Sequence, residues 1–71
     1  MFKSEAEVNL IKELYPKGTK IKLEYMDDIQ SPPIGTVGEV VCVDSIGQIH
    51  MKWENGSSLA LNVDVDKFQK I

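Results

Sequence analysis

Apolar side chains near the N-terminus recur every three or four residues, which is the spacing of one helix face. They are Val8, Leu10, Ile11, Leu14 and Tyr15. Ser4 and Glu7 have the spacing of a capping box, in which each side chain accepts a hydrogen bond from the backbone of the other residue. Pro16 then pushes the preceding residue toward extended geometry. The pattern therefore predicts a helix over residues 4–15.

After residue 19 the period changes to two, which is typical of a half-buried antiparallel strand. The inward set is Ile21, Leu23 and Tyr25, and the outward set is Lys20, Lys22 and Glu24. Two prolines and Gly35 in residues 27–35 predict a loop, because proline cannot donate a ladder hydrogen bond. Residues 20–25 are therefore the first predicted strand.

Residues 37–44 carry apolar side chains at both odd and even positions, so a second strand there has two interpretations. Either both of its faces are covered, with the helix on one of them, or a bulge near Cys42 shifts the alternation. Asn55-Gly56 is a strong hairpin signal after a third strand over residues 48–53. The remaining predicted strands are residues 58–61 and 68–71, separated by an irregular turn over residues 62–67.

These elements predict a mainly β member of the α+β class. Five short strands protect their edges best by closing into a small barrel. We therefore expect one domain over residues 1–71, with an N-terminal helix (4–15) and a five-stranded SH3-like barrel (19–71). A domain this small needs the extra core that the helix provides. The pattern favours packing of the helix on its own barrel, with docking onto a partner or homodimerisation as the alternatives.

Size and charge exclude several classes of protein. The 71 residues include 8 lysines, no arginine and 11 acidic residues, for a net charge of -3. This is too short for a multidomain enzyme, and no apolar run is long enough to span a membrane. Met1 to Glu5 lack the apolar region of a secretory signal, which predicts a cytoplasmic protein. The single Cys42 predicts a buried apolar side chain and no disulfide.

Short motifs spaced along most of the chain carry a resemblance to a known family. They are Tyr15-Pro16, Gly18-Thr19, Met26-Asp27-Asp28, Pro33, Gly35-Thr36, Gly38, Asp44, Gly47-Gln48-Ile49, Trp53, Asn55-Gly56-Ser57-Ser58-Leu59, Leu61, Asp66 and Phe68. Residues 15–71 resemble a small uncharacterised domain family that phages and integrative or conjugative elements of Gram-positive bacteria encode. The resemblance implies an SH3-like fold and a mobile-element setting, and it brings no activity and no catalytic residue. Residues 1–14 lie outside it.

The loop after the first strand is the leading candidate for a binding site. In SH3-like domains an acidic loop beside an aromatic groove binds extended, basic or proline-containing peptides. Carboxylates would pair with lysine or arginine of such a peptide, and aromatic side chains would stack on it. The predicted peptide- or protein-binding residues are Tyr25, Asp27, Asp28, Pro33, Trp53 and Asn55. The plainer interpretation places Trp53 in the core and uses the aspartates in Asx-turns.

Nucleic-acid binding is the alternative, through Lys17, Lys20, Lys22 and Lys52. Phosphate contacts need several basic side chains, so the negative net charge and the lack of arginine disfavour it. Solubilising a sheet edge is the simpler role of these lysines. Blocking a host protein through an acidic face ranks last.

Metal binding and catalysis have little support in the sequence. The acidic residues lack the spacing of a calcium loop, and one histidine with one cysteine is too few for zinc. His50 falls on the outward face of the third strand, and no catalytic constellation accompanies it. We therefore expect a non-enzymatic protein without a cofactor or metal, whose partner is another protein or peptide and not a membrane. The sequence leaves its oligomeric state open.

Overall fold

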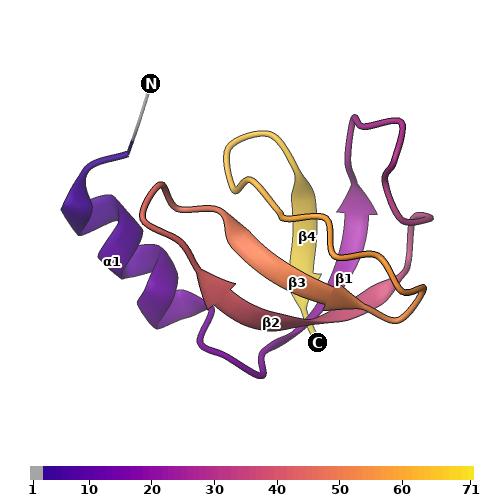
Figure 1. Ribbon diagram of the computed structural model, residues 1–71, viewed down its shortest axis with the longest axis horizontal. Coiled ribbons are helices and arrows are strands. Elements are labelled where there is room, and N and C mark those ends of the chain that lie inside the picture. Colours follow the sequence, from indigo (N-terminus) through magenta and orange to yellow (C-terminus); the bar gives the residue numbers. More distant parts are fainter. Residues whose placement is uncertain (1–2) are drawn as a thin grey trace.

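A computed structural model describes residues 3–71, so Met1 and Phe2 of the predicted domain lie outside the described part (Figure 1). The described residues form one helix, α1 (Glu5–Leu14), and a sheet of four strands. The strands are β1 (Lys20–Tyr25), β2 (Val37–Val43), β3 (Ile49–Trp53) and β4 (Lys67–Lys70). Their order is β3-β2-β1-β4, and every neighbouring pair is antiparallel.

The predicted five-stranded, closed SH3-like barrel is wrong. β3 and β4 lie at opposite edges of an open sheet, so nothing closes it among residues 3–71. The predicted fifth strand exists as β4, whereas residues 58–61 form no strand and make a single bridge between Leu61 and Ile49. The Ser57 hydroxyl accepts a hydrogen bond from the Leu59 N–H, 3.2 Å away. Such local side-chain bonds compete with a strand ladder, which explains why this segment does not continue as a strand.

The helix was predicted correctly within one residue at each end. Ser4 caps it, and the capping box is complete: the Glu7 N–H donates to the Ser4 hydroxyl and the Ser4 N–H donates to the Glu7 carboxylate, both at 3.2 Å. Val8 and Ile11 are buried, and α1 lies beside the end of β2 (Figure 1). The helix therefore packs on its own sheet.

A bulge explains why β2 carries apolar residues at both odd and even positions. The register with β3 shifts between Val40 and Cys42, so that Val40 faces the core and Cys42 pairs with His50. Val43 then turns back toward the core. Cys42 is exposed, and the prediction that it is buried was wrong, because the bulge moves it to the face opposite the core.

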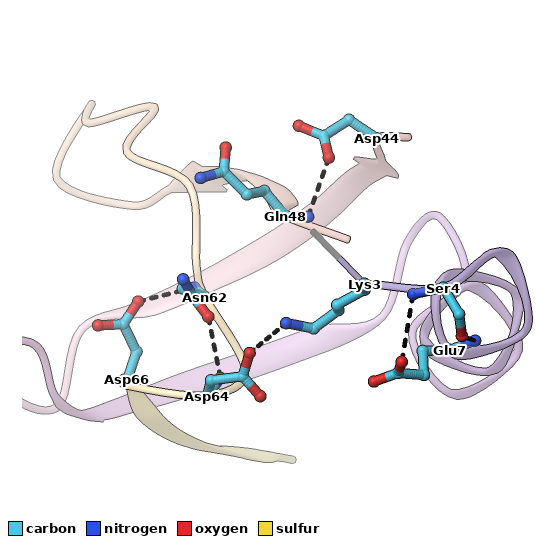
Figure 2. Close-up of polar contacts among 8 residues, drawn as sticks. All are labelled: Lys3, Ser4, Glu7, Asp44, Gln48, Asn62, Asp64 and Asp66. Atoms are coloured by element: carbon cyan, nitrogen blue, oxygen red, sulfur yellow. Dashed lines mark hydrogen bonds and ion pairs between the residues drawn. The ribbon is translucent and has the colours of Figure 1, made fainter. Parts of the chain in front are cut away.

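One face of the sheet carries the core. Its buried side chains are Ile11, Ile21, Leu23, Met26, Val40, Ile49, Met51, Trp53 and Leu61. Ile11 of α1 and the side chains of Leu59, Leu61 and Val63 after β3 pack in this core. Lys3, just before the helix, forms an ion pair with Asp64 of the segment after β3 (Figure 2). Asn62 and Asp66 shape the same turn, since the Asn62 N–H donates to the Asp66 carboxylate at 2.7 Å. The opposite face of the sheet is left open by residues 3–71, and its side chains Lys20, Lys22 and Lys52 are exposed.

Candidate functional site

The loop between β1 and β2, residues 26–36, lies at the far end of the sheet from α1 (Figure 1). Two buried side chains, Met26 and Pro32, anchor it to the core. Its return into β2 is held by the backbone, because the Gly35 N–H donates to the Leu23 carbonyl at 2.8 Å and the Leu23 N–H donates to the Thr36 carbonyl at 2.9 Å. The loop is therefore a shaped part of the fold rather than a free connection.

Asp28 shapes the tip of this loop. Its carboxylate accepts a hydrogen bond from the Gln30 N–H at 2.7 Å, and its carbonyl accepts one from the Ser31 N–H at 3.0 Å. This is the Asx-turn that the plainer interpretation foresaw. The turn leaves the Ile29 side chain fully exposed, at 101% of its reference area, and Ile34 is 63% exposed. The tip thus presents apolar side chains beside two exposed aspartates.

Four of the six predicted site residues belong to this region. Tyr25 ends β1, and Asp27, Asp28 and Pro33 follow in the loop, with all four side chains exposed. Their common location was predictable, because they are neighbours along the chain. Ile29 and Ile34 were not selected from the sequence, since an isoleucine in an unpaired loop has no periodic pattern to mark it as exposed.

The other two predicted residues lie elsewhere and have structural roles. Trp53 is only 2% exposed, and its indole N–H donates to the Leu59 carbonyl at 2.8 Å. It therefore offers almost no aromatic surface to a ligand. Asn55 lies in the turn after β3, where its side-chain oxygen accepts a hydrogen bond from the Ser57 N–H at 3.1 Å.

A groove of about 390 Å³ lies beside the open face of the sheet. Its lining residues are Lys20, Gly38, Glu39, Lys52, Trp53, Glu54 and Gly56. Lys20, Glu39 and Lys52 occupy one row across β1, β2 and β3, because Glu39 pairs in register with both lysines. Two of the four lysines of the nucleic-acid alternative therefore meet at this groove, and Lys17 and Lys22 do not line it.

Glu39 offsets much of the positive charge in the groove. The Lys20 ammonium lies 2.9 Å from the Glu39 carboxylate. The hydrogen bond and the charge of Lys20 lower the pKa of Glu39, with smaller contributions from the charges of Lys52 and Lys17. Sequence reasoning missed Glu39, since only the strand register shows that it stands between two lysines.

A second polar cluster closes the turn between β2 and β3. The Asp44 carboxylate accepts hydrogen bonds from the Gln48 N–H at 2.9 Å, shown in Figure 2, and from the Ile46 N–H at 3.1 Å. His50 Nε2 also lies 2.8 Å from this carboxylate and acts as a donor, since an ionised carboxylate only accepts. His50 is thus on the outward face, as expected, but bonded to Asp44.

Partial burial and hydrogen bonding oppose each other at Asp44. Removal from water favours the neutral acid, but the hydrogen bonds from His50, Gln48 and Ile46 outweigh this and lower the pKa of Asp44. The cluster stabilises a turn. Within residues 3–71, no three His, Cys, Asp or Glu side chains are grouped so that they could hold a metal ion.

A protein-family model, described as "Domain of unknown function (DUF4314)", matches residues 4–71. The chain belongs to this family. The match includes α1, so the DUF4314 domain begins earlier than residue 15, where the sequence resemblance begins. No curated protein and no solved structure matches the chain. In the described part of the DUF4314 domain, no helix is long and apolar enough to cross a membrane.

Proposed function

We propose that this DUF4314 domain is a non-enzymatic protein-binding module of a phage or mobile element, acting in the cytoplasm through its β1–β2 loop. The exposure of Ile29 at the tip of an anchored loop carries this proposal. The mobile-element setting rests on the resemblance of residues 15–71 to domains that such elements encode.

Three exposed apolar side chains fall within ten residues of one another around this loop. They are Tyr25, Ile29 and Ile34. Single exposed apolar residues are ordinary, whereas a group of them on one projecting segment is typical of an interaction surface. The fold does not need these side chains in its core, because Met26 and Pro32 already anchor the loop.

The order of the loop favours binding. A loop held by backbone bonds and an Asx-turn loses less conformational entropy when a partner immobilises it than a free loop does. Asp27 and Asp28 stand beside the apolar tip and favour a partner with basic side chains near its apolar contact. Among residues 3–71 neither aspartate makes an ion pair.

The nucleic-acid alternative has weaker support. Lys20 and Lys52 do share a groove, but Glu39 and Glu54 line the same groove. Phosphate binding gains affinity from uncompensated positive charge, and the chain as a whole carries a net charge of -3. It remains a prediction that the experiment below also addresses.

The experiment is an affinity capture from a lysate of the encoding organism, with and without nuclease. The immobilised wild-type domain is compared with an Ile29→Ser/Ile34→Ser variant. Val65→Ser is the matched control, because Val65 is 64% exposed, as Ile34 is 63% exposed, and lies outside the loop. Circular dichroism of each variant checks that it is folded.

We expect a protein that survives nuclease treatment, is lost with the loop variant and is retained by Val65→Ser. Identical proteins captured by wild type and the loop variant would contradict the proposal. A capture that disappears with nuclease and with Lys20→Glu/Lys52→Glu would transfer support to the nucleic-acid alternative.

A further inference from the structure

β4 is one of the two edges of the sheet, and its backbone pairing shows which of its groups face outward. The Ile71 N–H donates to the Lys20 carbonyl at 3.1 Å, which makes residues 20 and 71 a hydrogen-bonded pair. In an antiparallel ladder such pairs alternate with non-bonded ones, so Lys22 and Gln69 form the next bonded pair. Phe68 and Lys70, on either side of Gln69, belong to non-bonded pairs and therefore direct their N–H and C=O groups away from the sheet.

The partner of Phe68 on β1 supports this assignment. Leu23 pairs with Phe68 in register, and both backbone groups of Leu23 are used on the other side of β1. Its N–H donates to Thr36, and its carbonyl accepts from Gly35. Within residues 3–71, no turn or loop supplies a backbone hydrogen bond to Phe68 or Lys70.

The opposite edge of the sheet, β3, differs from β4 because its outward backbone groups are hydrogen-bonded within the chain. β3 is covered by residues 57–61, because Ile49 and Leu61 exchange two backbone hydrogen bonds of 2.9 and 2.8 Å. The Trp53 N–H donates to the Ser57 carbonyl at 3.0 Å. Within residues 3–71, the chain thus pairs the β3 edge with its own backbone and leaves outward-facing groups on β4.

Two of the four side chains of β4 are lysines. Lys67 and Lys70 are exposed, and they occupy opposite faces because side chains alternate along a strand. The Lys70 ammonium lies 4.9 Å from the centre of the Tyr15 ring, on the face that carries Phe68. An incoming strand would therefore meet one lysine on each of its faces, three residues apart.

We propose that the β4 edge binds an extended, acidic segment of a partner protein as an additional strand. Main-chain hydrogen bonds to Phe68 and Lys70 supply the attachment, as in other cases of strand addition. Carboxylates three residues apart oppose Lys67 and Lys70, and opposite charges across a strand pair are stabilising. The same lysines discourage neutral and cationic strands, so that the edge is selective rather than generally adhesive.

A second copy of the domain is a poorer occupant. It would offer only its own four-residue β4 strand. The area buried between two such short strands is far below the roughly 1,000 Å² that a stable protein interface buries. It would also place the lysines of one β4 strand near those of the other, and like charges across a strand pair are destabilising. An acidic segment of a larger partner has neither restriction. Its carboxylates oppose the lysines, and the rest of the partner can make further contacts outside the β4 edge.

The test is a titration of the ¹⁵N-labelled domain with the capped peptide acetyl-SETVES-amide. Its two glutamates are three residues apart, as Lys67 and Lys70 are. The control peptide, acetyl-SKTVKS-amide, replaces both glutamates with lysine. We expect saturable amide shifts that are largest at Phe68 and Lys70, and hydrogen exchange there slowed about tenfold by the acidic peptide. The lysine peptide should give no saturation.

Two variants locate the contact. Lys70→Pro removes an outward N–H without removing a donor to β1, so the fold should persist while peptide affinity falls at least about tenfold. Lys67→Glu should also weaken the acidic peptide. Lys12→Glu makes the same charge change on the exposed surface of α1 and should leave the affinity unchanged.

Three results would overturn the proposal. They are no saturable shift up to the solubility of the peptide, equal binding of both peptides, and concentration-dependent shifts at Phe68 and Lys70 without peptide, which would indicate a second copy. The Ile29→Ser/Ile34→Ser variant should bind the acidic peptide normally. The proposal for the β4 edge and the proposal for the loop surface can therefore be contradicted independently.

Discussion

Gly38 of β2 lies directly against the ring of Trp53 on β3. A Cβ atom built at Gly38 would be 2.6 Å from Cε3 of the indole, well inside van der Waals contact. The two residues are partners in register, and both are buried. Trp53 has little freedom to withdraw, because its N–H is bonded to the Leu59 carbonyl. Position 38 therefore requires glycine, because the Trp53 ring lies too close to the backbone for any side chain.

Gly38→Ala should lower the free energy of unfolding by about 1–3 kcal/mol, the usual range for overpacking a core. Urea denaturation followed by circular dichroism measures the change. Ser58→Ala, on the exposed surface, is the control and should change little. In a Trp53→Leu background, which makes room for the new methyl group, the cost of Gly38→Ala should shrink. An unchanged cost would show that the indole contact is not responsible.

Asp44 should make the stability of the domain depend on pH. Its folded-state pKa lies below the unfolded value of about 3.9, so its contribution is present above that pH and is lost as pH falls through the folded pKa. Asp44→Asn should remove this contribution and flatten the decline of stability on acidification. At pH 7 we expect a loss of about 1 kcal/mol, kept small because the carboxyl is partly exposed to water.

The measurement is a series of urea denaturation curves between neutral and acidic pH. Glu13→Gln is the control, since Glu13 is an exposed helix residue that also loses one negative charge. Equal pH slopes for wild type and Asp44→Asn would contradict the role assigned to the turn.

The two faces of α1 should respond differently to truncation. Ile11 is 7% exposed and belongs to the core, whereas Leu10 is 55% exposed. Ile11→Ala should cost about 2–5 kcal/mol, and Ile11→Val about 0.5–1.5 kcal/mol if the alanine variant fails to fold. Leu10→Ala should cost much less in thermal or urea unfolding. Comparable costs at both positions would mean that the helix also buries Leu10, for example in a dimer.

The N-cap gives a prediction of its own. Ser4→Ala removes the hydroxyl that accepts from the Glu7 N–H, and should destabilise the domain by about 1 kcal/mol. Ser4→Asp should keep most of the stability, because a carboxylate caps as well and interacts favourably with the helix dipole. Thermal unfolding monitored at the helix band distinguishes these outcomes, and equal losses in both variants would argue against a capping role.

Local features of the fold were predictable from the sequence because each depends on neighbours along the chain. The capping box, Pro16 and the apolar spacing placed α1 within one residue of its observed ends. Alternation placed β1 and the inward Ile21 and Leu23, but it was wrong for Tyr25, which is exposed beyond a register shift after Leu23. Apolar residues at successive positions around Cys42 indicated the bulge as one of two solutions. The acidic loop was also predictable as a unit, because Asp27, Asp28 and Pro33 are close in sequence.

What the sequence by itself determined is the helix, the four strands that form and the loop that we propose as the binding surface, whereas the predicted strand over residues 58–61 is absent. The tertiary structure alone decided that the sheet stays open, that residues 57–61 cover the β3 edge, and that Glu39 stands between Lys20 and Lys52. Each of these depends on strand register and on hydrogen bonds between distant segments. Hydrophobic periodicity records which face of a strand is buried, but it carries no information about which strand lies beside it or where the sheet ends.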